Sequence, residues 1–172
     1  MKTKTIMGVD FGVANIMYIA FNNNYYHYSF VSAPVIKKGR KLIKTGENPY
    51  EILDRYNYNI ALKVLYIAIK HQVRTIHMED LTGTSFTNNM FYYELQRGIQ
   101  TLAQDKNIKV RYVNRHMTSQ KCSLCGYIDK RNRINRKTFI CLKCGNTMNA
   151  DYNAAKNIAN PNIQSIKTSS PL

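Results

Sequence analysis

The chain has 172 residues, 25 Lys and Arg against 10 Asp and Glu, and a formal net charge of +15. Hydrophobic residues make up 44% of it, which excludes a disordered chain, and the scarcity of Gly and Pro excludes collagen-like and low-complexity classes. No apolar run reaches the ~18 residues of a membrane span, and the first residues lack the apolar core of a signal peptide. We therefore expect one ordinary domain in a cytoplasmic protein without a membrane partner.

The positive charge suggests a polyanionic partner, although a basic protein from a lysine-rich proteome would also carry it. Its distribution favours the first interpretation. Residues 101–150 contain eleven Lys and Arg but only two acids, Asp105 and Asp129. This concentration is more typical of a surface that contacts nucleic acid than of uniform compositional drift.

Apolar periodicity and turn residues predict three strands, a helix, a strand, a helix, a strand and a last helix, in that order. The expected bounds are 5–11, 15–21, 25–31, 49–72, 75–79, 90–106, 108–113 and 150–159, with loops at 32–48 and 81–89. An antiparallel three-stranded meander followed by βα units is the order that an RNase H-like fold requires. The predicted class is therefore α/β, with a mixed sheet and flanking helices.

Four cysteines lie in one 23-residue stretch with the spacing C-x2-C-x15-C-x2-C: Cys122, Cys125, Cys141 and Cys144. Two such knuckles close a tetrahedral four-sulfur cage, which predicts a zinc ribbon with one structural Zn2+. Gly126 and Gly145 follow the knuckles, where the turn favours positive φ. Disulfides and a redox dithiol are the alternatives, but the chain shows no secretion signal and has two matched pairs.

The loop between the two knuckles is strongly basic and is suited to phosphate contacts. It contains five cationic side chains against one acid: Lys130, Arg131, Arg133, Arg136 and Lys137. We expect these residues to bind nucleic acid.

Three acids occupy positions that suit a metal site. Asp10 and Glu79 end apolar strands, and Asp151 opens the last helix. Three carboxylates around one point favour Mg2+ or Mn2+, and two such ions can hydrolyse a phosphodiester. Each acid also has a simpler interpretation: a turn acid at Asp10, a solvated strand end at Glu79, and a helix N-cap at Asp151. From the residues alone, Asp80 competes with Glu79 as the ligand.

The assembled motifs resemble the TnpB/OrfB-type proteins, the transposon-encoded RNA-guided nucleases of the insertion-sequence transposase OrfB family, which are related to type V CRISPR effectors. The resemblance covers about residues 5–160. It rests on GVDFGVAN, on MEDL and on the block from MTSQKC to ADYNAAKNI at 117–158. The first motif also resembles the phosphate-binding turn of actin-like ATPases and sugar kinases, but those proteins need two such domains and this chain is too short for both.

The resemblance implies a RuvC-like nuclease core at 1–115, a zinc-ribbon insertion at 116–148, a final RuvC helix at 149–160 and a flexible tail at 161–172. It assigns the acidic triad to Asp10, Glu79 and Asp151, and thereby selects Glu79 over Asp80. The implied function is a two-metal, Mg-dependent endodeoxyribonuclease associated with a transposon or RNA-guided system. The alternative is a non-cleaving DNA- or RNA-binding regulatory module or a truncated transposon relic.

Full-length relatives carry an N-terminal half that holds the guide RNA, and this sequence contains none of it. The expected partners are therefore DNA and, if the missing half is supplied in trans, a guide RNA. The chain would act as a homodimer or with a separate RNA-binding subunit. The expected location is the cytoplasm of a prokaryotic cell, in association with the nucleoid.

Overall fold

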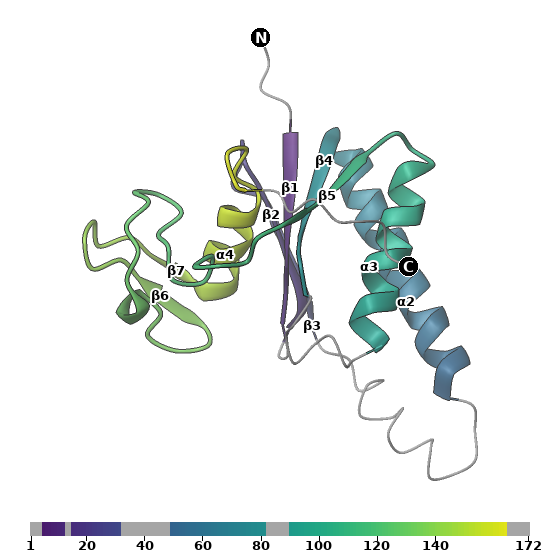
Figure 1. Cartoon of the computed structure of the whole chain (residues 1–172), viewed down its shortest axis with the longest axis horizontal. Coiled ribbons are helices and arrows are strands. Elements are labelled where there is room, and N and C mark those ends of the chain that lie inside the picture. Colours follow the sequence, from purple (N-terminus) through teal and green to yellow (C-terminus); the bar gives the residue numbers. More distant parts are fainter. Residues whose placement is uncertain (1–4, 13–14, 32–48, 82–89, 165–172) are drawn as a thin grey trace.

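A five-stranded mixed sheet forms the centre of the computed structural model, which describes residues 5–12, 15–31, 49–81 and 90–164. The strand order is β3-β2-β1-β4-β5. The elements are β1 (Thr5–Phe11), β2 (Asn15–Phe21), β3 (His27–Val31), α2 (Pro49–Lys70), β4 (Val73–Glu79), α3 (Met90–Gln104), β5 (Lys109–Val113), η1 (Lys130–Asn132), β6 (Thr138–Ile140), β7 (Thr147–Asn149) and α4 (Ala150–Ile158). The α/β fold predicted from the order of elements is confirmed (Figure 1).

The first three strands form the predicted meander, since β1 pairs with β2 and β2 with β3 in antiparallel fashion. The later strands are added in parallel, β4 beside β1 and β5 beside β4. Helices α2 and α3 cover one face of the sheet and α4 covers the other (Figure 1). Two parallel central strands, β1 and β4, therefore end at the same edge of the sheet.

The element bounds differ from those predicted by one or two residues, and backbone conformation explains the differences. The third strand begins at His27 instead of residue 25, because the Asn24 side chain accepts a hydrogen bond from the Tyr26 N–H and prolongs the turn. Helices α2 and α3 end before Gln72 and Asn107, which adopt φ of 51° and 56°. Left-handed residues of this kind terminate helices. The predicted loop at 32–48, the loop at 82–89 and the tail at 165–172 lie outside the described residues.

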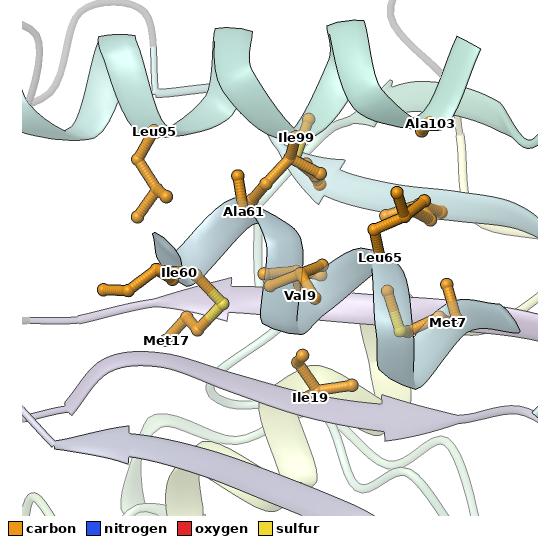
Figure 2. Packing of buried hydrophobic residues seen from close by; sticks show 14 of the residues in the cluster. Met7, Val9, Met17, Ile19, Ile60, Ala61, Leu65, Leu95, Ile99 and Ala103 are labelled. Atoms are coloured by element: carbon orange, nitrogen blue, oxygen red, sulfur yellow. The ribbon is translucent and has the colours of Figure 1, made fainter. Parts of the chain in front are cut away.

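The main core lies between the sheet and the helices α2 and α3 (Figure 2). Met7 and Val9 of β1 point to this side and are fully buried against Ile60, Leu65 and Ile99 of the two helices. Successive residues of a strand face opposite sides of a sheet, so Gly8 and Asp10 face α4 instead.

Helix α4 lies unusually close to β1. A Cβ atom placed on Gly8 would be 2.3 Å from the Ala155 carbonyl oxygen and 2.4 Å from the Ala159 nitrogen, so only glycine fits. The small residues at this contact, Ala155 and Ala159, are fully buried. The close approach sets the position of the first turn of α4 above the end of β1.

The cysteine-rich segment between β5 and α4 forms a small unit with its own two-stranded sheet, β6-β7. Two asparagines of α4 anchor it. The Asn153 side chain accepts from the Ser123 N–H and donates to the Lys121 carbonyl, and Asn157 donates to the carbonyls of Thr118 and Lys121. The ribbon is thereby held in a fixed position relative to the N-terminal turn of α4. Among the described residues, no helix has the length and apolar character needed to cross a membrane.

Candidate active site and zinc site

Three carboxylates from separate elements line one pocket of about 520 Å³. Asp10 lies near the end of β1 and Glu79 at the end of β4, and the pairing of Val9 with Met78 places the two acids side by side. Asp151 lies in the first turn of α4. The pocket lining includes Glu79 and not Asp80, whose backbone N–H donates to the Val113 carbonyl. The structure thus brings the three predicted acids together at one edge of the sheet.

Glu79 is 5% exposed, and its surroundings hold it in place. The Thr118 hydroxyl lies 3.3 Å from Glu79 Oε1, and Gln96 donates a 2.8 Å hydrogen bond to the Glu79 backbone carbonyl. Burial raises the pKa of Glu79 to about 7, although Arg115 and the hydrogen bonds to Thr118 and Asp10 lower it. The carboxylate form is therefore costly here unless a cation is close.

The ionised carboxylate of Asp10 is disfavoured even more strongly than that of Glu79. Burial, followed by the charges of Glu79 and Asp151, raises the pKa of Asp10 well above its ordinary value, and Arg133 only partly opposes this. The site thus collects negative charge that the protein's own cations do not fully neutralise.

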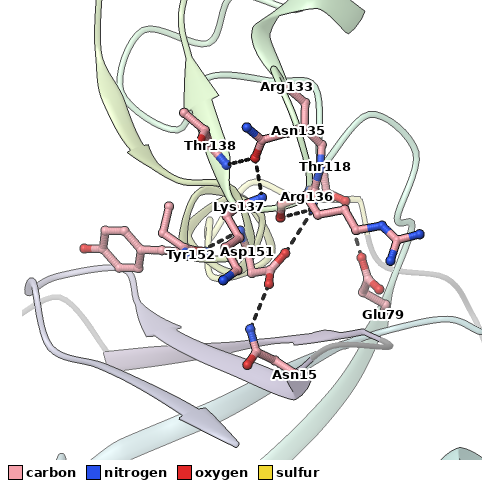
Figure 3. A network of polar contacts seen from close by, with 11 residues as sticks. Asn15, Glu79, Thr118, Arg133, Asn135, Arg136, Lys137, Thr138, Asp151 and Tyr152 are labelled. Atoms are coloured by element: carbon pink, nitrogen blue, oxygen red, sulfur yellow. Dashed lines mark hydrogen bonds and ion pairs between the residues drawn. The ribbon is translucent and has the colours of Figure 1, made fainter. Parts of the chain in front are cut away.

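Asp151 is not the N-cap of α4, so the simpler interpretation of this acid is wrong. Asn149 caps the helix by accepting hydrogen bonds from the backbone N–H groups of Asp151 and Tyr152. The Asp151 carboxylate is free to face the pocket, where each oxygen has one partner (Figure 3). The Asn15 amide donates to Oδ2 and the Arg133 guanidinium to Oδ1, both at 3.0 Å.

A hard divalent cation fits the chemistry of this site. Its donors are carboxylate oxygens, which Mg2+ and Mn2+ prefer. Burial raises the pKa of Asp10 and Glu79, and for Asp10 the neighbouring carboxylates add to this, so a bound cation would favour the ionised form of both. Asp10, Glu79 and Asp151 are the residues that would hold such ions. The contact between Arg133 and Asp151 occupies one carboxylate oxygen that an ion would need.

The four cysteines are gathered as predicted, with all their sulfur atoms within 4.8 Å of one another. Cys122 and Cys144 are 3.8 Å apart, and Cys125 and Cys141 are 3.5 Å apart. These distances exceed the ~2.05 Å of a disulfide, so the disulfide alternative is wrong, and they match the ~3.8 Å edge of a tetrahedron with Zn–S bonds of ~2.3 Å.

The local backbone supports the same cage. Gly126 and Gly145 adopt φ of 78° and 70°, and each donates its N–H to the carbonyl of the first cysteine in its knuckle. Burial opposes ionisation of Cys141, but the N–H groups of Cys144 and Lys143 lower the pKa of its thiol to about 7. Against the Asn146 N–H, burial and the neighbouring thiols raise the pKa of Cys144 to about 12, so ionisation of all four thiols would need the charge of a bound Zn2+.

The five basic residues of the ribbon loop do not act as one surface. Arg133 and Arg136 line the carboxylate pocket. Arg131 is paired with Asp129 at 2.7 Å, which leaves it less available to phosphate. Lys130 and Lys137 are exposed and do not line the pocket.

Several residues of the site were not identified as functional by the sequence analysis: Asn15, Gln96, Arg115 and Thr118. Thr118 belongs to the TSQ element that carried part of the resemblance, so a signal for it was present. Asn15 ends the GVDFGVAN motif, so a signal for it was present too. Gln96 and Arg115 gave no spacing signal, because Glu79, with which they interact, lies far away in the sequence.

Comparison with known proteins gives one matching family model, Cas12f1-like, TNB domain, over residues 92–158. The CRISPR-associated endodeoxyribonuclease Cas12f1 of Sulfoacidibacillus thermotolerans is 36% identical, over 94% of this chain and 46% of that protein. The putative RNA-guided DNA endonuclease InsQ of Escherichia coli K12 is 43% identical over 39% of this chain and 14% of its own length. The chain spans about half the length of the Cas12f1 protein it matches.

Solved structures give the same result. A Cas12f1–sgRNA–target DNA complex superimposes with a TM-score of 0.76 and 28% identity, over 91% of this chain and 50% of the Cas12f1 chain. The RuvC of T. thermophilus in complex with a Holliday junction substrate matches with a TM-score of 0.56 over 91% of both chains, at 13% identity, which shows the fold. The fold is thus RuvC-like. In sequence, the chain is similar to the type V effector Cas12f1 and to TnpB-like proteins, as the motifs predicted.

Proposed function

We propose that this chain provides the catalytic domain of a metal-dependent DNA endonuclease that hydrolyses phosphodiester bonds. The observation that carries the proposal is the convergence of Asp10, Glu79 and Asp151 on one pocket that is also lined by arginines. Folding alone does not require three carboxylates to converge, because their mutual repulsion destabilises the fold. A metal site accounts for them.

In this proposal Asp10, Glu79 and Asp151 would hold two Mg2+ or Mn2+ ions. Bound there, such a pair supplies a hydroxide for the attack and stabilises the departing 3′-oxygen. Asn15 and Thr118 orient the carboxylates of Asp151 and Glu79. Arg136, and Arg133 once it has left Asp151, contact the phosphates of the strand.

The zinc ribbon has a structural role, because four thiolates leave no ligand position for a water molecule or substrate. Through Asn153 and Asn157 it is joined to α4, the helix that carries Asp151. Loss of zinc would therefore disturb the carboxylate site as well as the ribbon.

The partners in this proposal are target DNA and a guide RNA. The superimposed Cas12f1 structure contains an sgRNA and target DNA, and this chain corresponds to half of that protein. We propose that this chain contributes the carboxylate pocket to an assembly of that kind.

A cleavage assay tests the enzymatic part directly. Zinc-loaded protein is incubated with labelled single-stranded and double-stranded DNA, with and without Mg2+. We expect cleavage that requires Mg2+ and is abolished by Asp10→Ala, while Asp105→Ala, at an exposed acid outside the pocket, retains it. Two results would favour the non-cleaving nucleic-acid-binding module instead. One is the same products from the wild type and Asp10→Ala, and the other is no cleavage product in the presence of Mg2+.

A further inference from the structure

A row of aromatic rings starts at the carboxylate site and runs along the α4 side of β2 and β3. We call Tyr18, His27, Tyr152 and Tyr25 the aromatic strip. The Tyr18 and His27 rings are stacked, with centroids 5.6 Å apart and planes 8° apart. The Tyr152 ring centroid is 5.0 Å from that of His27 and 6.2 Å from that of Tyr18. These three rings form one continuous cluster.

The fourth ring, Tyr25, is fixed at the outer end of the strip by Lys156. The Lys156 ammonium lies 6.0 Å from the Tyr25 centroid and donates hydrogen bonds to the carbonyls of Phe21 and Asn24, at 2.7 and 3.2 Å. The Tyr26 N–H bond to Asn24 holds the same turn. The turn that presents Tyr25 is therefore ordered by α4, although Tyr25 itself remains 89% exposed.

Folding does not explain why aromatic rings occupy the outer positions. Tyr18 is buried and forms the inner end of the strip, but His27 is exposed and Tyr152 half-buried. Neither His27 nor Tyr25 belongs to the main core. Exposed aromatic residues gathered in one row mark a contact surface more often than scattered single ones do.

The strip is continuous with the carboxylate site. Tyr18 lies opposite Asp10 in the β1–β2 pairing, so both side chains face α4. Tyr152 directly follows Asp151, and its ring points away from the Asp151 carboxylate (Figure 3). Burial, and next the charge of Asp151, raises the pKa of Tyr18. A strand leaving the carboxylates in this direction meets the rings in order.

We propose that the aromatic strip binds a single DNA strand next to the cleavage site, with unpaired bases stacked on His27, Tyr152 and Tyr25. The proposal deepens the nuclease function and rests on it for the placement of the strand. Stacking on aromatic side chains tolerates any base sequence, and it requires bases that are not paired in a duplex. Among polyanions, this chemistry therefore selects single strands, while the net charge of +15 attracts the backbone.

Equilibrium binding without cleavage tests the strip. Fluorescence anisotropy with a labelled 12-nucleotide oligo-dT is measured on zinc-loaded protein, with no chelator and no added Mg2+. Each titration is repeated with an abasic oligonucleotide of the same length. The matched control is Tyr66→Ala, because Tyr66 is a 67% exposed tyrosine on α2, at the opposite face of the sheet.

We expect Tyr25→Ala to weaken oligo-dT binding roughly fivefold to a hundredfold, which corresponds to the loss of one stacked base. His27→Ala should act in the same direction, and Tyr25→Phe should retain binding. Binding of the abasic strand, and the salt dependence of binding, should not change, because no phosphate contact is removed.

Equal oligo-dT affinity for Tyr25→Ala, His27→Ala and Tyr66→Ala would overturn the proposal and assign the strip to a protein contact. An equal loss for the abasic strand would also overturn it, because the rings would then act through the backbone. Since the assay needs no cleavage, a failure of the nuclease proposal would be seen separately in the Mg2+ assay.

Discussion

Replacement of Gly8 by alanine tests whether the contact between β1 and α4 positions the carboxylate site. The added Cβ would lie 2.3 Å from the Ala155 carbonyl oxygen and 2.4 Å from the Ala159 nitrogen, whereas ordinary contact begins near 3.4 Å. Both neighbours are backbone atoms and no side-chain rotation relieves the overlap. Helix α4 must therefore move away from the sheet by about 1 Å.

This movement has two consequences of different size. Overpacking of this kind costs about 3 kcal/mol, at the upper end of the usual range, and a chain of this length loses ~2–4 °C per kcal/mol. We expect the melting temperature to fall by about 6–12 °C. Asp151 moves with the helix relative to Asp10 and Glu79, and a 1 Å displacement at a reacting centre costs about 100-fold in rate.

Thermal unfolding and Mg2+-dependent cleavage are measured on the same preparations, the latter well below the melting temperature of the variant. Gly98→Ala in α3 is the control, because its Cβ would be 3.5 Å from the Ala61 Cβ, an ordinary contact. That variant should be unchanged or about 1 kcal/mol more stable, since alanine favours a helix. A Gly8→Ala protein with wild-type melting temperature and cleavage rate would refute the positioning role of this contact.

Three further predictions concern metals and protons. Arg133→Ala frees an oxygen of Asp151, and because the pair is only partly buried we expect about 1–2 kcal/mol, or roughly 5- to 30-fold, tighter Mn2+ binding by electron paramagnetic resonance. Burial raises the pKa of Glu79 from 4.5 to about 7, so the folded state holds this proton more tightly than the unfolded state. Without divalent ions, the free energy of unfolding should therefore fall as the pH rises from 4.5 to 7. Glu79→Gln should flatten that part of the plot of melting temperature against pH. Chelation of zinc, or Cys125→Ser, should lower the melting temperature and also reduce Mg2+-dependent cleavage.

Each of these has its own control or refuting result. Arg131→Ala removes an arginine that is paired with Asp129 outside the pocket, and it should leave Mn2+ affinity unchanged. If Arg133→Ala also binds Mn2+ with wild-type affinity, Arg133 does not compete with the metal. A Glu79→Gln profile parallel to that of the wild type would place the titrating group elsewhere. A melting curve that chelator does not alter would argue against a structural zinc.

Features encoded by neighbouring residues could be predicted from the sequence. The C-x2-C pairs and the glycines after them define knuckles within a few residues, and the apolar alternation of β1 and the periodicity of α2 and α3 are equally local. Strand ends could be placed to within two residues, and the left-handed residues Gln72 and Asn107 explain why α2 and α3 end earlier than predicted. For Asp10 and Glu79, their position at the ends of apolar strands was itself the signal.

Contacts between distant residues were decided by the tertiary structure alone. Asn15 reaches Asp151 across 136 positions of sequence, and Arg133 reaches it from the ribbon loop. The entry of Arg133, and not of Arg131, into the pocket was decided in the same way.

The sequence by itself determined a basic RNase H-like chain with a zinc ribbon and three candidate acids, because periodicity, ligand spacing and charge are local properties. The tertiary structure decided how those parts meet. The absence of a side chain at Gly8 allows α4 to approach β1, the register of β1 beside β4 aligns two acids, and the ribbon brings Arg133 to the third. These are packing relations between separate elements, and only the folded chain has them.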